Sequence, residues 1–103
     1  MRDAAELVER IEPLLPGIAA RAAEGARLRR LPNETLAELR EADVFRALVS
    51  PERGGHGLGL DSVVALGLTL GQADTATAWV TTFLVMHSWL LSMFPDAVVD
   101  EVF

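Results

Sequence analysis

The longest pattern in the chain is an uncharged and largely apolar run between Asp74 and Asp96. On a helix drawn through this run at 100° per residue, small polar side chains form one stripe and large apolar side chains fill the opposite arc. The stripe contains Asp74, Thr77, Thr81, Ser88 and Ser92, and the apolar arc contains Trp79, Val80, Phe83, Met86, Leu90, Leu91 and Phe94. The run therefore predicts one long helix that begins after an Asp74 N-cap and offers a small polar stripe for close helix packing.

Helical spacing also marks the first third of the chain, from about Asp3 to Arg30. Apolar positions three and four residues apart share one face, namely Leu7, Ile11, Leu14 and Leu15. Pro13 lies inside this pattern, and Pro16-Gly17 interrupts it. We therefore expect a kinked helix or two helices in this region.

Shorter helices account for most of the remaining chain. One begins at Leu31-Pro32 and ends near Ala42, since proline is favoured in a first helical turn. A second has Asp61 as its predicted N-cap, and a last one begins at Pro95-Asp96. No segment shows the alternation of a strand, so the fold class is all-α, an up-and-down or orthogonal bundle of about five helices.

The segment from Ser50 to Gly59 contains four glycines and one proline in ten residues, which favours a loop. It lacks the preceding strand and the G-x-G-x-x-G spacing of a dinucleotide site, so we expect a structural turn and no phosphate cradle. His56 in this loop has no second ligand at a suitable spacing. We expect it to be solvated or to cap a neighbouring segment, and we expect no metal site.

Charge and composition exclude several classes of partner. The formal net charge is −6 and all nine basic residues are arginine, so nucleic acid is a poor partner. The cluster Arg27, Arg29 and Arg30 is typical of a helix C-terminus, although contact with an anion or a partner is the alternative. The chain has no cysteine, which excludes disulfides and thiolate metal sites. Its first residues lack an apolar signal core, so we expect a cytoplasmic protein.

The uncharged run is about long enough to cross a bilayer. However, threonine, serine and histidine dilute its hydrophobicity, and acidic residues flank it on both sides. No arginine anchors either end, contrary to the usual charge pattern of membrane-spanning helices. We therefore expect no membrane contact, and a buried helix within a larger assembly.

His87 is the one imidazole in this run, and it falls within the apolar arc. We therefore expect a desolvated and neutral ring, because burial disfavours the charged form. A neutral ring has one donor and one acceptor that both require partners, and no partner is evident nearby in the sequence. His87 is therefore either a packed core residue or an active-site residue, and the same two interpretations apply to Trp79 and Trp89.

The order of motifs resembles the N-terminal helical domain of the acyl-CoA dehydrogenase superfamily. The motifs are Leu31-Pro32, the hydrophobic segment Phe45 to Val49, Gly54-Gly55-His56-Gly57, Ala73-Asp74 and the central His87. The chain is most similar to the flavin-dependent monooxygenase branch, as judged by Thr77-Ala78-Trp79-Val80, His87-Ser88-Trp89 and Phe94-Pro95-Asp96. The Gly-x-x-x-Gln-Lys run of dehydrogenases is missing. Ser50 and Arg53 depart from the family pattern, where proline and an aromatic residue are common.

The resemblance implies an oxygenase that uses O2 and reduced flavin, FMN or FAD, delivered by a separate flavin reductase. Its substrate would be aromatic or polyketide-like. By the same resemblance, His87 is the catalytic residue, which would orient or deprotonate the substrate or hydrogen-bond the oxygen-loaded flavin. Trp79, Phe83 and Leu91 would line the cavity for flavin or substrate.

Members of this family are several times longer and contain a middle β-domain and a C-terminal helical bundle. Residues 1–103 would be the N-terminal helical domain, completed by the rest of the enzyme or by a partner chain, in a homo-oligomer that is a tetramer by resemblance. By itself the chain is expected to bind no flavin tightly and to catalyse nothing. The alternatives are an acyl-CoA dehydrogenase domain acting on a CoA thioester, or a truncated, non-catalytic helical interaction module.

Overall fold

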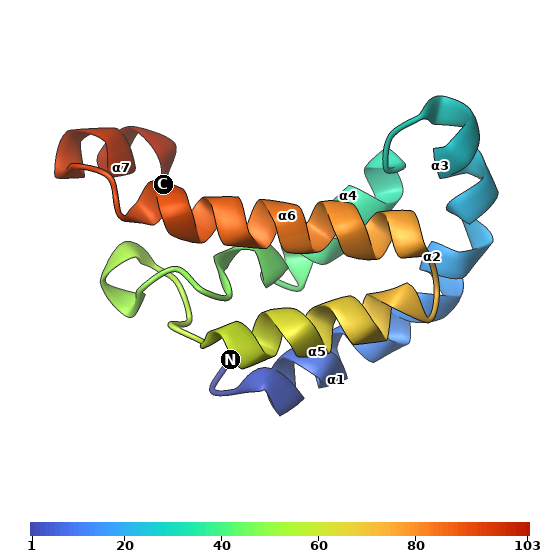
Figure 1. Cartoon of the computed structure of the whole chain (residues 1–103), viewed down its shortest axis with the longest axis horizontal. Helices are drawn as coiled ribbons and strands as arrows, with labels where there is room; N and C mark the ends of the chain where they lie inside the picture. Colours follow the sequence, from blue (N-terminus) through green and yellow to red (C-terminus); the bar gives the residue numbers. More distant parts are fainter.

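The computed structural model describes residues 1–103, which form a helical bundle without strands (Figure 1). The α-helices are α1 (Ala4–Ile11), α2 (Leu15–Ala20), α3 (Ala22–Leu28), α4 (Asn33–Glu41), α5 (Leu60–Gly71), α6 (Thr75–Ser92) and α7 (Asp96–Val102). Three short 3₁₀ helices, η1 (Glu12–Leu14), η2 (Val44–Arg46) and η3 (Pro51–Arg53), lie between them. The all-α class is confirmed, and the number of helices exceeds five because the N-terminal segment is divided.

A reciprocal cap starts α1. The Asp3 carboxylate accepts a hydrogen bond from the Glu6 backbone N–H at 2.9 Å, and the Glu6 carboxylate accepts one from the Arg2 backbone N–H at 2.8 Å. This arrangement satisfies two donors that a helix start leaves free. Because the Arg2 N–H bond favours the ionised carboxylate, the pKa of Glu6 is lowered from its ordinary value of 4.5.

Two prolines divide the N-terminal segment, as the sequence predicted. Pro13 lies in η1 and Pro16 at the start of α2, where the missing N–H costs little. A further break at Arg21 separates α2 from α3, and the Arg21 side chain there donates to Thr35 Oγ1 at 3.0 Å and to Glu38 at 2.8 Å. These bonds connect the α2–α3 junction to α4.

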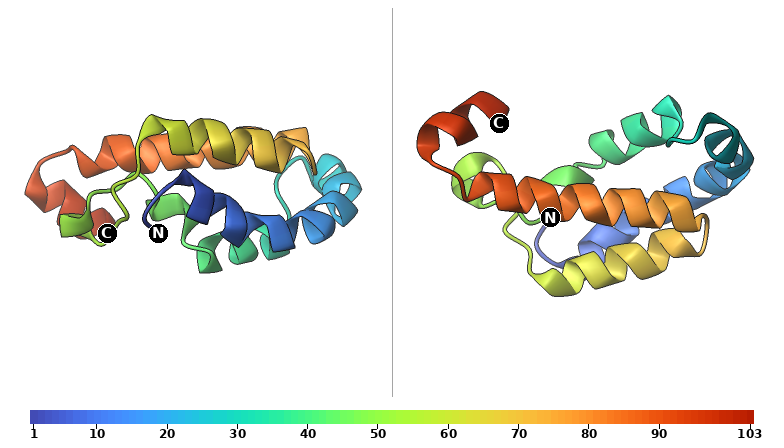
Figure 2. Two further views of the ribbon diagram at one scale, coloured as in Figure 1. Left: turned by 90° about the horizontal axis from the view of Figure 1, so that it is seen from below. Right: turned by 45° about the horizontal axis from the view of Figure 1, so that its top comes forward.

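The helices form two layers. Figure 2 shows α5 and α6 side by side in one layer, with α1 and α4 behind them. The core lies between the layers, where large side chains from several helices are fully buried. These include Leu7, Ile11, Ile18, Leu39, Val44, Leu66, Leu70 and Val85. No element of the chain is stacked on the opposite side of the α5–α6 layer.

The predicted small polar stripe of α6 is buried in part, and α5 meets α6 at Thr82, which lies outside that stripe. Thr77, Thr81 and Val85 are buried on the inner side of α6. A Cβ added at Gly67 would lie 3.4 Å from Thr82 Cγ2, so this glycine faces α6 closely, whereas one added at Gly71 would meet no atom within 4 Å. Of these two glycines, Gly67 alone is in van der Waals contact with α6.

Asp74 caps α6 as predicted. Its carboxylate accepts hydrogen bonds from the Thr77 backbone N–H at 3.0 Å and from Thr77 Oγ1 at 2.6 Å. The N-cap predicted at Asp61 is wrong, since α5 begins one residue earlier and Gly59 occupies the cap position. There the Ser62 hydroxyl donates to the Gly59 carbonyl at 2.6 Å, and Asp61 lies in the first turn, where the helix dipole still favours an acid. Pro32 likewise precedes α4 as its N-cap.

The glycine-rich segment is a structural turn, as predicted. The backbone N–H groups of residues 55–58 donate to carbonyls within residues 46–50, at 2.9–3.1 Å. A Cβ at Gly55 would overlap the Val49 carbonyl, so only glycine permits this approach. From the same loop, the Arg53 guanidinium pairs with Asp96 and Asp100 and so connects the loop to α7.

Candidate active-site face on helix α6

His87 is exposed on the outer side of α6, so the predicted desolvation is wrong within this chain. The reason is that α6 packs on the core with the side opposite to the one expected. Thr77, Thr81 and Val85 face inward, so the side of α6 that carries His87 faces away from the protein. Any burial of this histidine must come from atoms outside these 103 residues.

The His87 ring has a partner that side-chain patterns did not reveal. Its Nδ1 lies 2.8 Å from the Phe83 carbonyl oxygen, one helical turn back. The ring also stacks on the Phe83 ring, with centroids 3.9 Å apart and an interplanar angle of 22°. Since a carbonyl can only accept, Nδ1 must carry the proton, and in a neutral ring Nε2 is then the unprotonated acceptor. This backbone bond was missed because the sequence pattern considers side chains only.

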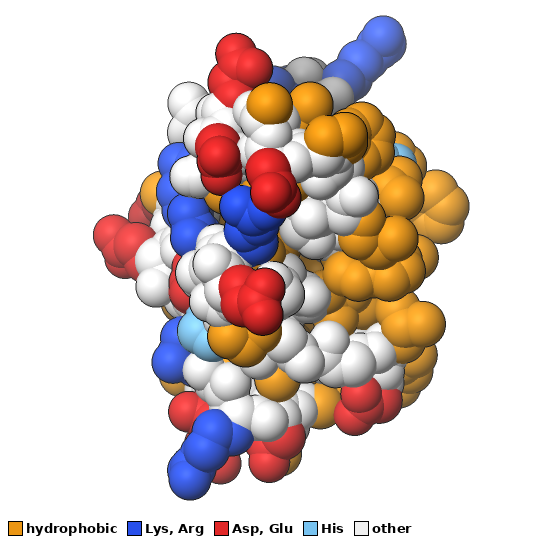
Figure 3. Space-filling model, turned by 90° about the vertical axis from the view of Figure 1, so that its left-hand side faces the viewer, with side chains coloured by type: hydrophobic (Ala, Val, Ile, Leu, Met, Phe, Trp, Pro, Cys, Tyr) orange, Lys and Arg blue, Asp and Glu red, His pale blue; other side chains and the backbone are white.

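Trp79 and Phe83 share this outer side of α6, whereas Leu91 lies nearer the buried side. Trp79 is 73% exposed and Phe83 51%, while Leu91 is half-buried. Leu60, Val64 and Leu68 of α5 are also exposed, at intervals of one helical turn. Figure 3 shows hydrophobic side chains gathered along the side of the molecule that α5 and α6 form, with charged side chains concentrated elsewhere.

We call this surface the outer face, and it is defined by His87 together with exposed apolar residues of α5, of α6 and of the turn after α6. The apolar members are Leu60, Val64, Leu68, Trp79, Phe83, Met86, Leu90, Met93 and Phe94. An apolar area of this extent on one side is unusual for an isolated chain and typical of a surface that another protein or a ligand covers.

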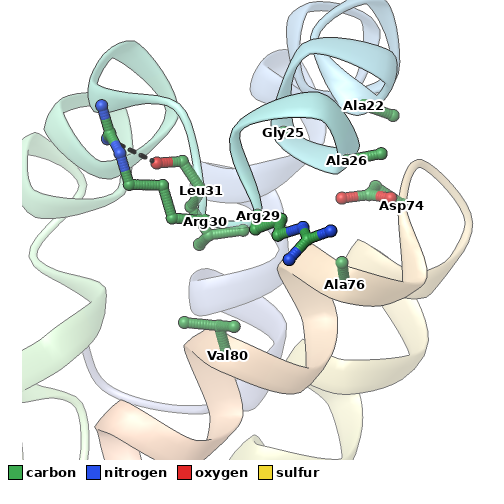
Figure 4. Close-up of a pocket in the computed structure, with 9 residues that line it drawn as sticks. All are labelled: Ala22, Gly25, Ala26, Arg29, Arg30, Leu31, Asp74, Ala76 and Val80. Carbon is green, nitrogen blue, oxygen red and sulfur yellow. Dashed lines mark hydrogen bonds between the residues drawn. The ribbon is translucent and has the colours of Figure 1, made fainter.

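The best-formed pocket lies elsewhere, between α3 and the start of α6 (Figure 4). Its volume is about 250 Å³, near the lower end of ligand-site volumes. It contains Val80 from the apolar arc but none of the four predicted site residues. Arg29 extends beside Ala76 and Asp74, and it makes no hydrogen bond or ion pair. Because the Asp74 carboxylate is already engaged by Thr77, this pocket offers little organised chemistry.

The arginine cluster near this pocket follows the structural prediction. Helix α3 ends at Leu28, with Arg29 as its C-cap in the left-handed region at φ 58°. Arg27 lies in the last turn, where a cation meets the negative end of the helix dipole. Arg30 turns away from the pocket, and its Nη1 donates to Asn33 Oδ1 at 2.9 Å.

His56 makes two hydrogen bonds and leaves no free ring nitrogen. Its Nε2 lies 2.5 Å from Asp43 Oδ2, and its Nδ1 lies 2.7 Å from the Met1 amino group. Asp43 has φ 60° and begins η2, so this contact fixes a tight turn of the backbone. His56 therefore has a structural role, and no cluster of three or more side chains could hold a metal ion around it.

A flavin implied by the family can be tested against the outer face. The apolar and aromatic side chains of the outer face suit a flat ring system, and the free Nε2 of His87 supplies one polar contact. The glycine loop is closed against Val49 and offers no cradle for the phosphate groups of FMN or FAD. The residues therefore fit one wall of a flavin and substrate cavity and not a complete flavin site.

None of the helices combines the length and hydropathy that a membrane crossing requires.

The chain is similar to several curated oxygenases. It is 32% identical over 98 residues to the pigment production hydroxylase of Rhodococcus sp., covering 95% of this chain and 25% of that protein. It is 33% identical over 96 residues to the oxygenase component of p-hydroxyphenylacetate 3-hydroxylase from Acinetobacter baumannii, covering 93% and 23%. It is 35% identical over 103 residues to the flavin-dependent monooxygenase, oxygenase subunit HsaA, of Mycobacterium tuberculosis, covering 98% and 26%.

No family model and no solved structure matches the chain. The chain spans about a quarter of the length of the curated relatives it matches. These relatives agree with the branch indicated by the motifs around Trp79, His87 and Phe94. These relatives therefore confirm the resemblance to the flavin-dependent oxygenase components of the acyl-CoA dehydrogenase-like family.

Proposed function

We propose that the outer face is one wall of the active site of a two-component flavin-dependent monooxygenase. The substrate would be aromatic or polyketide-like, and the flavin, FMN or FAD, would arrive reduced from a separate reductase. The observation that carries the proposal is His87, which presents a free ring nitrogen amid exposed aromatic residues. When bound, reduced flavin would supply the electrons that activate O2.

The chain's own residues would bind and orient the substrate. The exposed rings of Trp79 and Phe83 provide a flat apolar surface, and with Leu91 they would exclude water once the site is closed. In its neutral form, His87 Nε2 can accept a hydrogen bond from a substrate hydroxyl and take its proton as that oxygen becomes more acidic. This role requires only an acceptor within hydrogen-bond reach.

The outer face also indicates how the site would be completed. On the family pattern, a middle β-domain and a C-terminal helical bundle would cover it, in a homo-oligomer that is a tetramer by resemblance. Covering the face would remove from water several side chains that are about half or more exposed, at about 25 cal/mol per Å² of apolar surface. Domain contact and active-site formation would then use the same residues.

The experiment begins with the intact mass of the protein in its native source, compared with 11.1 kDa for this chain. The full-length protein is then assayed with a flavin reductase, O2 and a panel of phenols, separating hydroxylated product from hydrogen peroxide. We expect His87→Ala to lose most hydroxylation, by roughly 10²–10⁴-fold for a general base, while the circular dichroism spectrum is retained. The matched control is Leu28→Ala, an apolar position on α3 that is 40% exposed and does not belong to the outer face. Full hydroxylation by His87→Ala would refute the site role.

A second candidate function is a non-catalytic helical interaction module, which the extent of the outer face favours. It predicts that the chain self-associates or captures a partner through α5 and α6. Sedimentation of the chain alone tests this, with Leu68→Glu as the disrupting variant, since Leu68 is 70% exposed. A monodisperse monomer at high concentration would count against this candidate.

A further inference from the structure

We infer that Phe83 is a positioning residue for His87, which fixes the imidazole as the Nδ1–H tautomer with Nε2 as its only acceptor. The relevance of this arrangement to catalysis rests on the proposed function. The arrangement itself rests on two contacts within α6, a hydrogen bond to the Phe83 carbonyl and a stack on the Phe83 ring.

The hydrogen bond selects the tautomer. A neutral imidazole exchanges between two forms that differ in which nitrogen carries the proton. At 2.8 Å from a carbonyl oxygen, Nδ1 gains a bond only when it is protonated, and an unprotonated Nδ1 would place two lone pairs against each other. A net bond worth about 0.5–1.5 kcal/mol favours the Nδ1–H form by roughly two- to tenfold.

The ring stack selects the orientation. Side chains on a helix lean toward its N-terminus, so His87 meets the residue one turn before it and not the residue one turn after it. The 22° interplanar angle brings the two rings nearly parallel over one another. Removing the Phe83 ring would leave the carbonyl in place but release the imidazole to rotate about its side-chain bonds, so the hydrogen bond would be made part of the time.

The consequence is a defined chemical role for each nitrogen. With Nδ1 occupied by the backbone, His87 can meet a ligand only through Nε2, and in the neutral form only as an acceptor. The ligand must therefore bring the hydrogen, as a phenolic or other hydroxyl group does. A carbonyl or ether at the same place would find no donor unless the ring were protonated.

The test reads the tautomer directly and needs no turnover. The ¹⁵N-labelled chain is studied by long-range proton–nitrogen correlation, at a concentration where sedimentation shows a monomer and at an alkaline pH that favours the neutral imidazole. We expect His87 Nδ1 to resonate as a protonated nitrogen and Nε2 as an unprotonated one. Phe83→Ala should shift both resonances toward the average of the two tautomers, and Phe83→Tyr, which keeps the ring, should restore them.

Leu90→Ala is the matched control. Leu90 is 47% exposed against 51% for Phe83, and it lies one turn on the other side of His87. We expect its truncation to leave both nitrogen resonances unchanged. An Nε2–H tautomer in the parent chain, or resonances in Phe83→Ala identical to those of the parent, would overturn the inference. A correct tautomer combined with full hydroxylation by His87→Ala would refute the proposed function alone.

Discussion

Thr77 and Thr81 lie one turn apart on the buried stripe of α6, but their hydroxyl groups have different surroundings. Thr77 Oγ1 donates to Asp74 at 2.6 Å, whereas Thr81 Oγ1 is buried and has no hydrogen-bond partner. Replacing each by valine keeps the branched shape and removes only the hydroxyl. The two substitutions should therefore change the free energy of unfolding in opposite directions.

The magnitudes follow from the bonds. An unpaired buried hydroxyl costs about 1–3 kcal/mol, so Thr81→Val should raise the free energy of unfolding by about 1 kcal/mol or more. Thr77→Val loses a charge-assisted bond and part of the α6 cap, which should lower it by about 1–2 kcal/mol. At about 2.1 cal/mol/K per residue, the unfolding entropy of 103 residues makes 1 kcal/mol equivalent to roughly 5 °C in Tm.

The assay is thermal and urea unfolding followed by circular dichroism, with both variants and the parent chain measured at equal concentration. Helix propensity differs little between threonine and valine, so it does not obscure the comparison. If Thr81→Val lowers the free energy of unfolding as much as Thr77→Val does, then the Thr81 hydroxyl has a partner and the reasoning fails.

Further predictions concern the loop, α7 and the N-terminus. Gly55→Ala should destabilise the chain by at least about 2 kcal/mol, because the added Cβ would overlap the Val49 carbonyl. Gly71→Ala places its Cβ in open space and should stabilise the chain by up to about 1 kcal/mol. Urea unfolding of the two variants tests both expectations. Arg53→Ala should speed amide hydrogen exchange within α7, and unchanged exchange would show that α7 does not depend on this ion pair. Because the pKa of Glu6 is lowered in the folded chain, the Glu6 carboxylate stabilises the fold above the pKa it has in the unfolded chain. This contribution is lost as the pH falls through the pKa of the folded state. Glu6→Gln should therefore remove this part of the pH dependence in acid unfolding.

The sequence was sufficient to predict the helices, but not to predict which side of α6 is exposed. Breaks at Pro13 and Pro16 and the cap at Asp74 were predictable because they depend on local backbone chemistry. Periodicity also separated most of the two sides of α6, but Val80 and Leu91 of the predicted apolar arc are half-buried, because at 100° per residue both lie within about 60° of the buried Thr77. The expectation that the apolar side lies inside failed at His87, because periodicity does not reveal whether the covering atoms belong to the same chain.

The sequence grouped the side chains of the candidate site only in part. Trp79, Phe83 and His87 share one surface as predicted, and the motifs that surround them indicated the family that the relatives confirm. The bond from His87 to the Phe83 carbonyl could not be foreseen from residue types, because every residue offers the same backbone acceptor. The roles of these residues in catalysis stay predictions.

The outer face of α5 and α6 has a consequence for how the chain behaves in solution. A net charge of −6 keeps copies apart at low ionic strength, but the Debye length falls to about 10 Å at 0.1 M salt. Sulfate and similar salts also strengthen the association of apolar surface. The solubility of the chain should therefore fall steeply with added ammonium sulfate, well before its helices unfold. Low-salt buffers are thus the conditions in which its monomer can be purified and studied.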